Sequence, residues 1–287
     1  MRIAKIEGAF GVLACVDLPA EAGAALHRLP VTHRILLENL LRQGGEAARA
    51  GRADLLAWLE RGRSEAAITF SPSRILMHDT TCGPALVDIA TMRDVLAAAG
   101  GDPTRLNPDR PVATSTDHSL AVDFAGVGDA AARNMARELE RNGERYRFMK
   151  WASGAVDGFR VFPPGSGIMH TINMERLATV VARETRDDVP WAVPDTLVGT
   201  DSHTPHVDAL GVIAIGVGGL EAENVMLGRA SWMRLPEIVG VELTGKRQPG
   251  ITATDVVLAL TEFLRKSKVV GAYLEFYGQG AASLTLG

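Results

Sequence analysis

The sequence predicts an α/β fold, and two observations carry that prediction. Short apolar runs of strand length alternate along the chain with longer stretches that have helical spacing. Several of the short runs end at polar or glycine-rich segments, as strands of a parallel sheet do where they enter loops. With 46% hydrophobic residues among 287, the chain can bury a substantial core in one large domain or two smaller ones.

The first third contains two predicted helices and one strand. Residues 34–41 form an amphipathic stretch that ends at Gly44 and Gly45, and a second short helical stretch contains Trp58. Residues 73–77 are an apolar run typical of a strand. A polar segment, residues 78–84, separates this strand from the next predicted helix.

The middle of the chain repeats this alternation. We expect helices over residues 85–99 and 131–148, the second of them with a charged outer face. Short extended segments precede polar or glycine-rich turns, and these turns contain most of the candidate site residues. The extended segments are residues 111–116, 159–162 and 196–198.

The last third predicts the start of a second unit. Residues 211–219 alternate apolar residues with glycine, which favours close backbone packing, and a helix follows over 221–227. Residues 237–243 form a strand, a capping box at 252–255 begins a helix, and 269–276 form a further strand. We therefore divide the chain into a first domain, 1–236, and the beginning of a second, incomplete α/β domain, 237–287.

Composition limits the function classes. With 34 acidic and 30 basic residues the formal charge is −4, so no basic face predicts a nucleic-acid partner. No apolar stretch approaches the roughly 20 residues that cross a bilayer, and no signal peptide is expected, so we expect no membrane partner. Only two cysteines, Cys15 and Cys82, are present. This usage indicates a reducing compartment, and we expect a cytoplasmic protein.

Four of the seven histidines share one kind of position. Each follows a predicted strand or extended segment, where ligands bind in α/β folds, and imidazole can exchange protons near neutral pH. A single histidine of this kind is more often a hydrogen-bonded turn residue, but four at equivalent positions indicate a site. They are His78, His118, His170 and His203.

Two carboxylates accompany these histidines. Asp117 directly precedes His118, and Asp201 lies two residues before His203. A carboxylate can orient an imidazole and raise its basicity, as general acid–base catalysis requires. Ser202 has no obvious base in the sequence, so we interpret it as a hydrogen-bond donor to substrate.

Three other interpretations are weaker. Histidines are abundant, but neither they nor the cysteines show the spacing of a known zinc-binding motif, so zinc binding is a weak interpretation. The segment 216–219 lacks the full phosphate-loop pattern, so close backbone packing is the better interpretation. Cys82 lies near His78 and Asp79 in sequence, but buried and inert cysteine is the commoner case.

Taken together, the segments resemble the N-terminal part of the aconitase superfamily. The matching pieces, in order, are residues 29–41, 117–119, 164–170, 197–204 and 216–223. This resemblance implies a three-layer α/β/α N-terminal domain. The segments 201–210 and 227–231, with His78, are similar to the iron–sulfur-dependent 2-methylcitrate dehydratases. The segment 80–85 fits that subgroup less well, and aconitate hydratase is the alternative.

The resemblance also implies roles for the site residues. His118, supported by Asp117, would protonate the leaving hydroxyl of a small tricarboxylate substrate. His170, Asp201 and His203 would surround the water or hydroxyl on the open iron of a [4Fe–4S] cluster. Ser202 and His78 would hydrogen-bond a substrate carboxylate.

The cluster ligands are expected elsewhere. The family uses three cysteine thiolates, and neither Cys15 nor Cys82 matches them, so we predict no metal ligand in this chain. We expect a fragment, a truncated reading frame or one subunit of a split enzyme, which needs missing downstream domains or a partner subunit. Alone the chain is expected to be inactive, and a truncated relic or binding module is the non-enzyme alternative.

Overall fold

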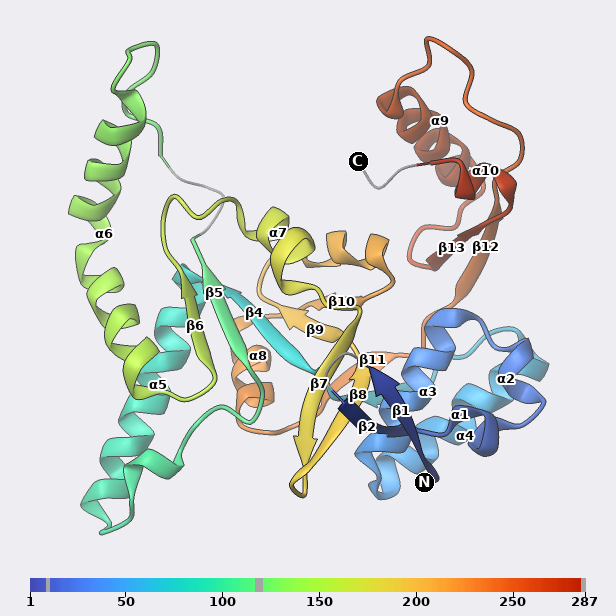
Figure 1. Ribbon diagram of the computed structural model, residues 1–287, viewed down its shortest axis with the longest axis horizontal. Coiled ribbons are helices and arrows are strands. Elements are labelled where there is room, and N and C mark those ends of the chain that lie inside the picture. Colours follow the sequence, from blue (N-terminus) through green and yellow to red (C-terminus); the bar gives the residue numbers. More distant parts are fainter. Residues whose placement is uncertain (9–10, 117–120, 285–287) are drawn as a thin grey trace. The chain divides into compact units, whose positions relative to one another are not determined.

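The structure is a computed structural model that describes residues 1–8, 11–116 and 121–284. Its backbone contacts divide the chain into two compact units. Unit 1 contains residues 1–2, 17–69 and 232–287, and unit 2 contains residues 3–16 and 70–231. Figure 1 shows the elements of both units.

Unit 2 is built on a five-stranded parallel sheet with the order β10-β9-β4-β5-β6. Its strands are β4 (Arg74–His78), β5 (Val112–Ser115), β6 (Phe159–Phe162), β9 (Thr196–Gly199) and β10 (Ile213–Gly216). The central strands β4 and β9 are short and have apolar, buried middles, as strands covered on both faces do.

Helices lie against both faces of this sheet. Leu76 and Leu197 belong to a core cluster with Met169 and Val207, which come from the helical segments between the strands. Because side chains alternate along a strand, Ile75 and Val198 point to the opposite face. The helices α5 and α8 also contact β4. The predicted α/β class is confirmed.

The helical elements of unit 2 vary widely in length. They are α5 (Asp79–Ala98), η1 (Pro103–Arg105), α6 (Ala130–Ala155), α7 (Met169–Ile172), η2 (Asn173–Leu177), η3 (Thr204–Leu210) and α8 (Gly219–Met226). The helix α6 is longer than predicted, and Asn142 interrupts it with non-helical angles. The helix α5 begins six residues before the predicted start at 85, because polar residues form its first turns.

A second sheet of unit 2 was not predicted. It has the order β1-β2-β8-β7, and the hairpins β1–β2 and β7–β8 are antiparallel. These strands are β1 (Ile3–Gly8), β2 (Gly11–Val16), β7 (Val181–Arg186) and β8 (Val189–Pro194). Most of β1 is exposed and β7 carries charged side chains, so neither shows a clear apolar alternation.

Unit 1 combines a helical part with a βαβ unit. Its helices are α1 (Leu18–Ala22), α2 (Ala25–Arg28), α3 (Val31–Gln43), α4 (Gly45–Arg61), α9 (Ala253–Lys266) and α10 (Gln279–Ala282). The strands β3 (Ala67–Phe70) and β11 (Ser231–Arg234) pair, and β12 (Ile238–Glu242) runs parallel to β13 (Tyr273–Tyr277). The strand predicted over 269–276 starts four residues later, because residues 269–272 form a turn.

The capping box before α9 is confirmed. The Thr252 hydroxyl accepts a hydrogen bond from the backbone N–H of Asp255 at 3.2 Å. The Asp255 carboxylate accepts from the backbone N–H of Thr252 at 2.8 Å. Two backbone donors at the helix start are therefore satisfied reciprocally. Among the described residues, no helix is long and apolar enough to cross a membrane.

Candidate active site

The singled-out polar residues that the structure describes gather at one edge of the parallel sheet of unit 2. The strands β4, β6 and β9 run in the same direction, so their carboxyl ends lie at that edge. His78 is the last residue of β4, and Asp201 follows the end of β9 by two residues. His170 lies in α7, after the loop that leaves β6. This is the edge at which α/β folds bind ligands.

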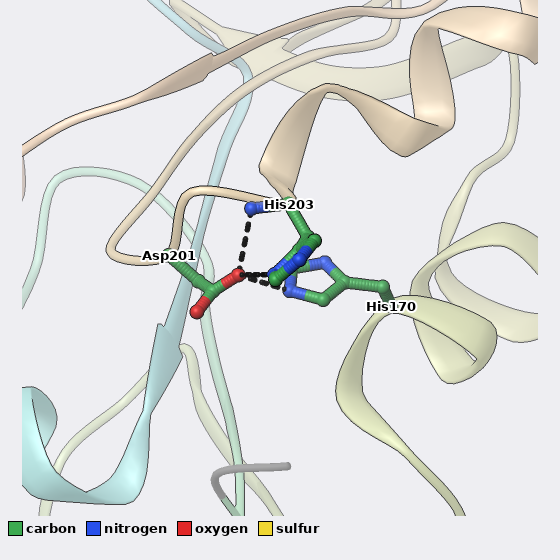
Figure 2. Close-up of side chains that lie close together, drawn as sticks. All are labelled: His170, Asp201 and His203. Atoms are coloured by element: carbon green, nitrogen blue, oxygen red, sulfur yellow. Dashed lines mark hydrogen bonds and ion pairs between the residues drawn. The ribbon is translucent and has the colours of Figure 1, made fainter. Parts of the chain in front are cut away.

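Asp201 is the centre of the cluster, as Figure 2 shows. Its Oδ1 lies 2.7 Å from Nε2 of His170 and 2.9 Å from Nδ1 of His203. The same oxygen accepts the backbone N–H of His203 at 2.7 Å. One carboxylate oxygen thus orients two imidazole rings, one of them from a residue 31 positions away in the sequence.

Local electrostatics keep Asp201 ionised. Burial works to raise the pKa of Asp201, but the hydrogen bonds from the backbone and ring of His203 and from His170 outweigh it. The pKa of Asp201 is held at about 2. Both ring nitrogens must therefore carry the hydrogen when they bond to this carboxylate. Burial also lowers the pKa of His170, although Asp201 opposes that shift, so the ring of His170 is neutral near pH 7.

The turn after β9 places Asp201 through close packing. The Thr204 hydroxyl donates to the carbonyl of Asp201 at 2.7 Å, and its side chain is fully buried. A Cβ on Gly199 would lie 2.6 Å from Cγ2 of Thr204, and one on Gly216 would lie 3.1 Å from the carbonyl oxygen of Asp201. Glycine allows the approach at 199 without a shift of Thr204, and at 216 a larger side chain would require the Asp201 carbonyl to move by a few tenths of an ångström. At Gly216 this geometry agrees with the interpretation of the segment 216–219 as close backbone packing, whereas a Cβ on Gly218 would meet nothing within 4 Å.

A buried ion pair positions the segment that carries His170. The Arg74 guanidinium binds both carboxylate oxygens of Asp195, at 2.8 and 3.1 Å. Its third nitrogen donates to the side-chain oxygen of Asn173 at 2.9 Å. Asn173 begins η2, three residues after His170, and Asp195 directly precedes β9. Arg74 therefore connects the two chain segments that supply His170 and Asp201.

His78 belongs to a hydroxyl-rich group beside this cluster. Its Nδ1 lies 2.5 Å from the Thr80 hydroxyl, and its backbone N–H donates to the Thr200 hydroxyl at 3.2 Å. The Thr81 and Thr200 hydroxyls lie 2.7 Å apart. Thr200 is the residue before Asp201, so these bonds connect the end of β4 to the turn after β9.

Of the remaining predicted site residues, the structure describes Ser202 but not Asp117 or His118. Ser202 is exposed, and its hydroxyl lies 3.5 Å from Nδ1 of His203, which is too long for a strong hydrogen bond. Asp117 and His118 follow β5 but lie outside the described residues.

Sequence reasoning missed His206. Its ring centroid lies 5.8 Å from that of His170 and 5.4 Å from that of His203. The spacing of three residues from His203 was the available signal, because a short helical turn brings such residues to one side. Asp208 was also missed. Burial raises the pKa of Asp208 to about 7.

The two cysteines do not fit an iron–sulfur cluster as ligands. Cys82 is fully buried in α5, and burial raises the pKa of its thiol to about 12. A cluster ligand must be a thiolate. Cys15 lies in β2, and the whole sequence has no third cysteine. The residues of this chain therefore support no chemical step through such a cluster.

Fold and site together define an α/β protein with a histidine–carboxylate cluster at the carboxyl edge of a parallel sheet. Comparison with known proteins identifies its family. The model of the "Aconitase family (aconitate hydratase)" matches residues 54–287. The chain belongs to the aconitase family, and the resemblance stated from its sequence is confirmed.

Curated relatives carry two names. An aconitate hydratase A of Cupriavidus necator is 58% identical over 92% of this chain. A 2-methylcitrate dehydratase (2-methyl-trans-aconitate forming) of Shewanella oneidensis is 55% identical over 94% of it. An aconitate hydratase A of Escherichia coli is 46% identical over 94%. The chain spans about 30% of the length of these relatives, with 30%, 30% and 31% covered respectively.

Proposed function

We propose that this chain is part of a hydro-lyase that dehydrates or hydrates a tricarboxylic acid. The main candidate is 2-methylcitrate dehydratase, and aconitate hydratase is the alternative. The observation that carries the proposal is the shared Oδ1 of Asp201, which binds both His170 and His203 in a chain of the aconitase family.

The chain's own residues suit the handling of a departing hydroxyl. Asp201 supplies a fixed negative charge, and it orients two imidazoles in the way that proton transfer requires. His203 is about half exposed, with 48% of its side chain accessible, so a substrate oxygen can reach it. We propose that His170, Asp201 and His203 surround the water or hydroxyl.

The other roles extend the resemblance. We propose that His118, supported by Asp117, protonates the leaving hydroxyl, and that His78 and Ser202 bind a substrate carboxylate. The hydroxyls around His78 support its orientation, because a bond at Nδ1 leaves Nε2 for a ligand.

A [4Fe–4S] cluster is proposed for the complete enzyme, with its thiolates outside this chain. They would come from the parts of the relatives that this chain does not span, or from a partner subunit. The division at residue 237 and the cytoplasmic location are also proposals. The low cysteine count supports the location.

Turnover assays test which tricarboxylic acid the enzyme prefers. The completed enzyme, with its cluster reconstituted, would be assayed on citrate and on 2-methylcitrate. We expect a higher kcat/KM for 2-methylcitrate, because the segment 201–210 is similar to that subgroup. Equal or greater activity on citrate would establish the aconitate hydratase alternative. No activity on either substrate would favour a relic or binding module.

A further inference from the structure

We propose that His170, Asp201 and His203 form a binding site for a single divalent transition-metal ion, such as Co²⁺ or Zn²⁺, which the chain binds through nitrogen and oxygen atoms alone. The proposal rests on the geometry of this cluster and not on the proposed function. All three residues lie in unit 2.

The three side chains present their ligand atoms to one point. One ring nitrogen of His170, one ring nitrogen of His203 and a carboxylate oxygen of Asp201 all lie within 4.8 Å of one another. Figure 2 shows both rings with a nitrogen directed at the same carboxylate oxygen. Two imidazoles and one carboxylate are a ligand set that binds divalent first-row transition ions on one face of the metal.

The distances favour a six-coordinate ion. Neighbouring ligand atoms around an octahedral ion with bonds of about 2.1 Å lie about 3 Å apart, and around a tetrahedral ion about 3.3 Å apart. The two contacts to Asp201 are 2.7 and 2.9 Å, close to the octahedral spacing, and the ligand atoms of the two rings lie within 4.8 Å of each other, so side-chain rotations that bring the rings together would admit an octahedral ion. Three positions of such an ion would then remain for water or another oxygen ligand.

Binding of the ion also balances charge and protons. The ion replaces the two ring hydrogens that now lie between the nitrogens and Asp201. An imidazole that carries a single ring hydrogen moves it to the other ring nitrogen, Nδ1 in His170 and Nε2 in His203, so metal binding by this tautomer change releases no proton. Oδ1 of Asp201 accepts three hydrogen bonds, as a carboxylate does, and the negative charge of a carboxylate offsets part of the charge of the cation.

The site is accessible yet held in place. The side chains of His170 and Asp201 are only 9% and 10% exposed, whereas His203 is 48% exposed. The buried pair is fixed by the contacts of Thr204 and Arg74, and the exposed ring leaves a path for the ion. A preformed site of this kind needs little rearrangement to bind.

The test is calorimetric titration of the metal-free 287-residue chain with CoCl₂ and with ZnCl₂. We expect one ion per chain. His203→Asn and Asp201→Asn should weaken binding more than about tenfold, because even groups outside the ligand shell contribute about 10–100-fold. The control His27→Asn alters an exposed histidine of unit 1 and should leave affinity unchanged.

Three further measurements make the outcome decisive. Circular dichroism and thermal melting would show that His203→Asn, a change at a half-exposed position, leaves the fold intact. The visible spectrum of the Co²⁺ complex should show the weak bands of six nitrogen and oxygen ligands. Absence of binding, binding unchanged by His203→Asn, or the intense charge-transfer band of a Co²⁺ thiolate would each overturn the proposal.

Discussion

At the scale of single residues, Asp201 concentrates the chemistry of this chain. Its Oδ1 accepts three hydrogen bonds, two from imidazoles and one from the backbone. Bonds to an ionised acceptor are stronger than neutral ones, and together they overcome the effect of burial on its pKa. An asparagine at this position would keep an acceptor oxygen but lose the negative charge, and its amide NH₂ group would donate where the carboxylate accepts.

The first prediction concerns Asp201→Asn. In the completed enzyme we expect kcat to fall by about 10²–10⁴-fold, because a misoriented imidazole loses its acid–base role. Steady-state kinetics would measure the loss. The matched control is Asp188→Asn, at an exposed turn with a positive φ of 61° that asparagine tolerates. An unchanged kcat in Asp201→Asn would contradict the assignment.

The second prediction concerns Asp208, whose pKa burial raises to about 7 from its ordinary value of 3.8. Between these pH values the folded chain binds more protons than the unfolded chain, so its stability falls as the pH rises through about 7. Asp208→Asn keeps an acceptor for the Ala214 N–H, now 2.9 Å away, and removes the charge.

We therefore expect Asp208→Asn to be more stable than the wild type above pH 7. The gain should be on the order of 1 kcal/mol, discounted because the carboxyl group is only partly buried. Urea denaturation at several pH values would measure it. The difference should shrink as the pH falls towards 3.8. A difference that is constant with pH would count against this account.

At the scale of elements, the turn after β9 determines where Asp201 lies. Gly199 ends the strand directly beneath the Thr204 side chain, and the Thr204 hydroxyl binds the Asp201 carbonyl. The end of β9, the turn after it and Asp201 therefore pack against one another. A methyl group at Gly199 would displace all three.

The third prediction is that Gly199→Ala destabilises the chain by about 1–3 kcal/mol, the usual effect of overpacking. It should also lower the affinity of the cluster for Co²⁺. The control is Gly83→Ala, because a Cβ at Gly83, inside α5, would meet nothing within 4 Å. That control should be neutral or stabilising by up to about 1 kcal/mol. Equal melting temperatures for Gly199→Ala and the wild type would contradict the packing argument.

The fourth prediction concerns the capping box of α9. Thr252→Ala removes the acceptor for the Asp255 N–H and should destabilise the helix by about 1 kcal/mol. Hydrogen exchange of the first-turn amides of α9 would measure the effect locally. Thr261→Ala is the comparison, because the Thr261 hydroxyl bonds only to a helical carbonyl, that of Val257. Similar exchange in both variants would argue against a capping role.

At the scale of the whole molecule, the chain supplies the histidine–carboxylate cluster of the enzyme proposed above but no ligands that suit its proposed cluster. It brings histidines and a carboxylate together, but its two cysteines do not suit a cluster. It also spans about 30% of the length of its relatives. The ionisable groups and the metal centre of the proposed enzyme would therefore come from different parts of the polypeptide, or from different polypeptides.

The fifth prediction follows from this division. The 287-residue chain, treated with iron and sulfide under reducing conditions, should assemble no [4Fe–4S] cluster and hydrate neither cis-aconitate nor 2-methylaconitate. Addition of the remaining part of the enzyme should restore both cluster and activity. Visible absorption would follow the cluster, and loss of the substrate's conjugated double bond would follow hydration. Activity of the chain alone would refute the prediction.

Local sequence pattern predicts much of the fold. The apolar runs at 73–77 and 196–198 correspond to β4 and β9, and the box at 252–255 is the cap of α9. These signals are local, since periodicity and capping depend on residues within a few positions. The sheet β1-β2-β8-β7 escaped prediction because its edge strands are exposed or charged. The first turns of α5 escaped because they are polar and precede Pro84.

The sequence alone identified the family and the residue types, including His170, Asp201 and His203 as candidates. Only the tertiary structure decided that one oxygen of Asp201 binds both rings, and that His206 lies beside them. Only burial in the fold could raise the pKa of Asp208. The physical reason is that side chains distant in sequence meet through strand order and loop packing, which no local pattern encodes.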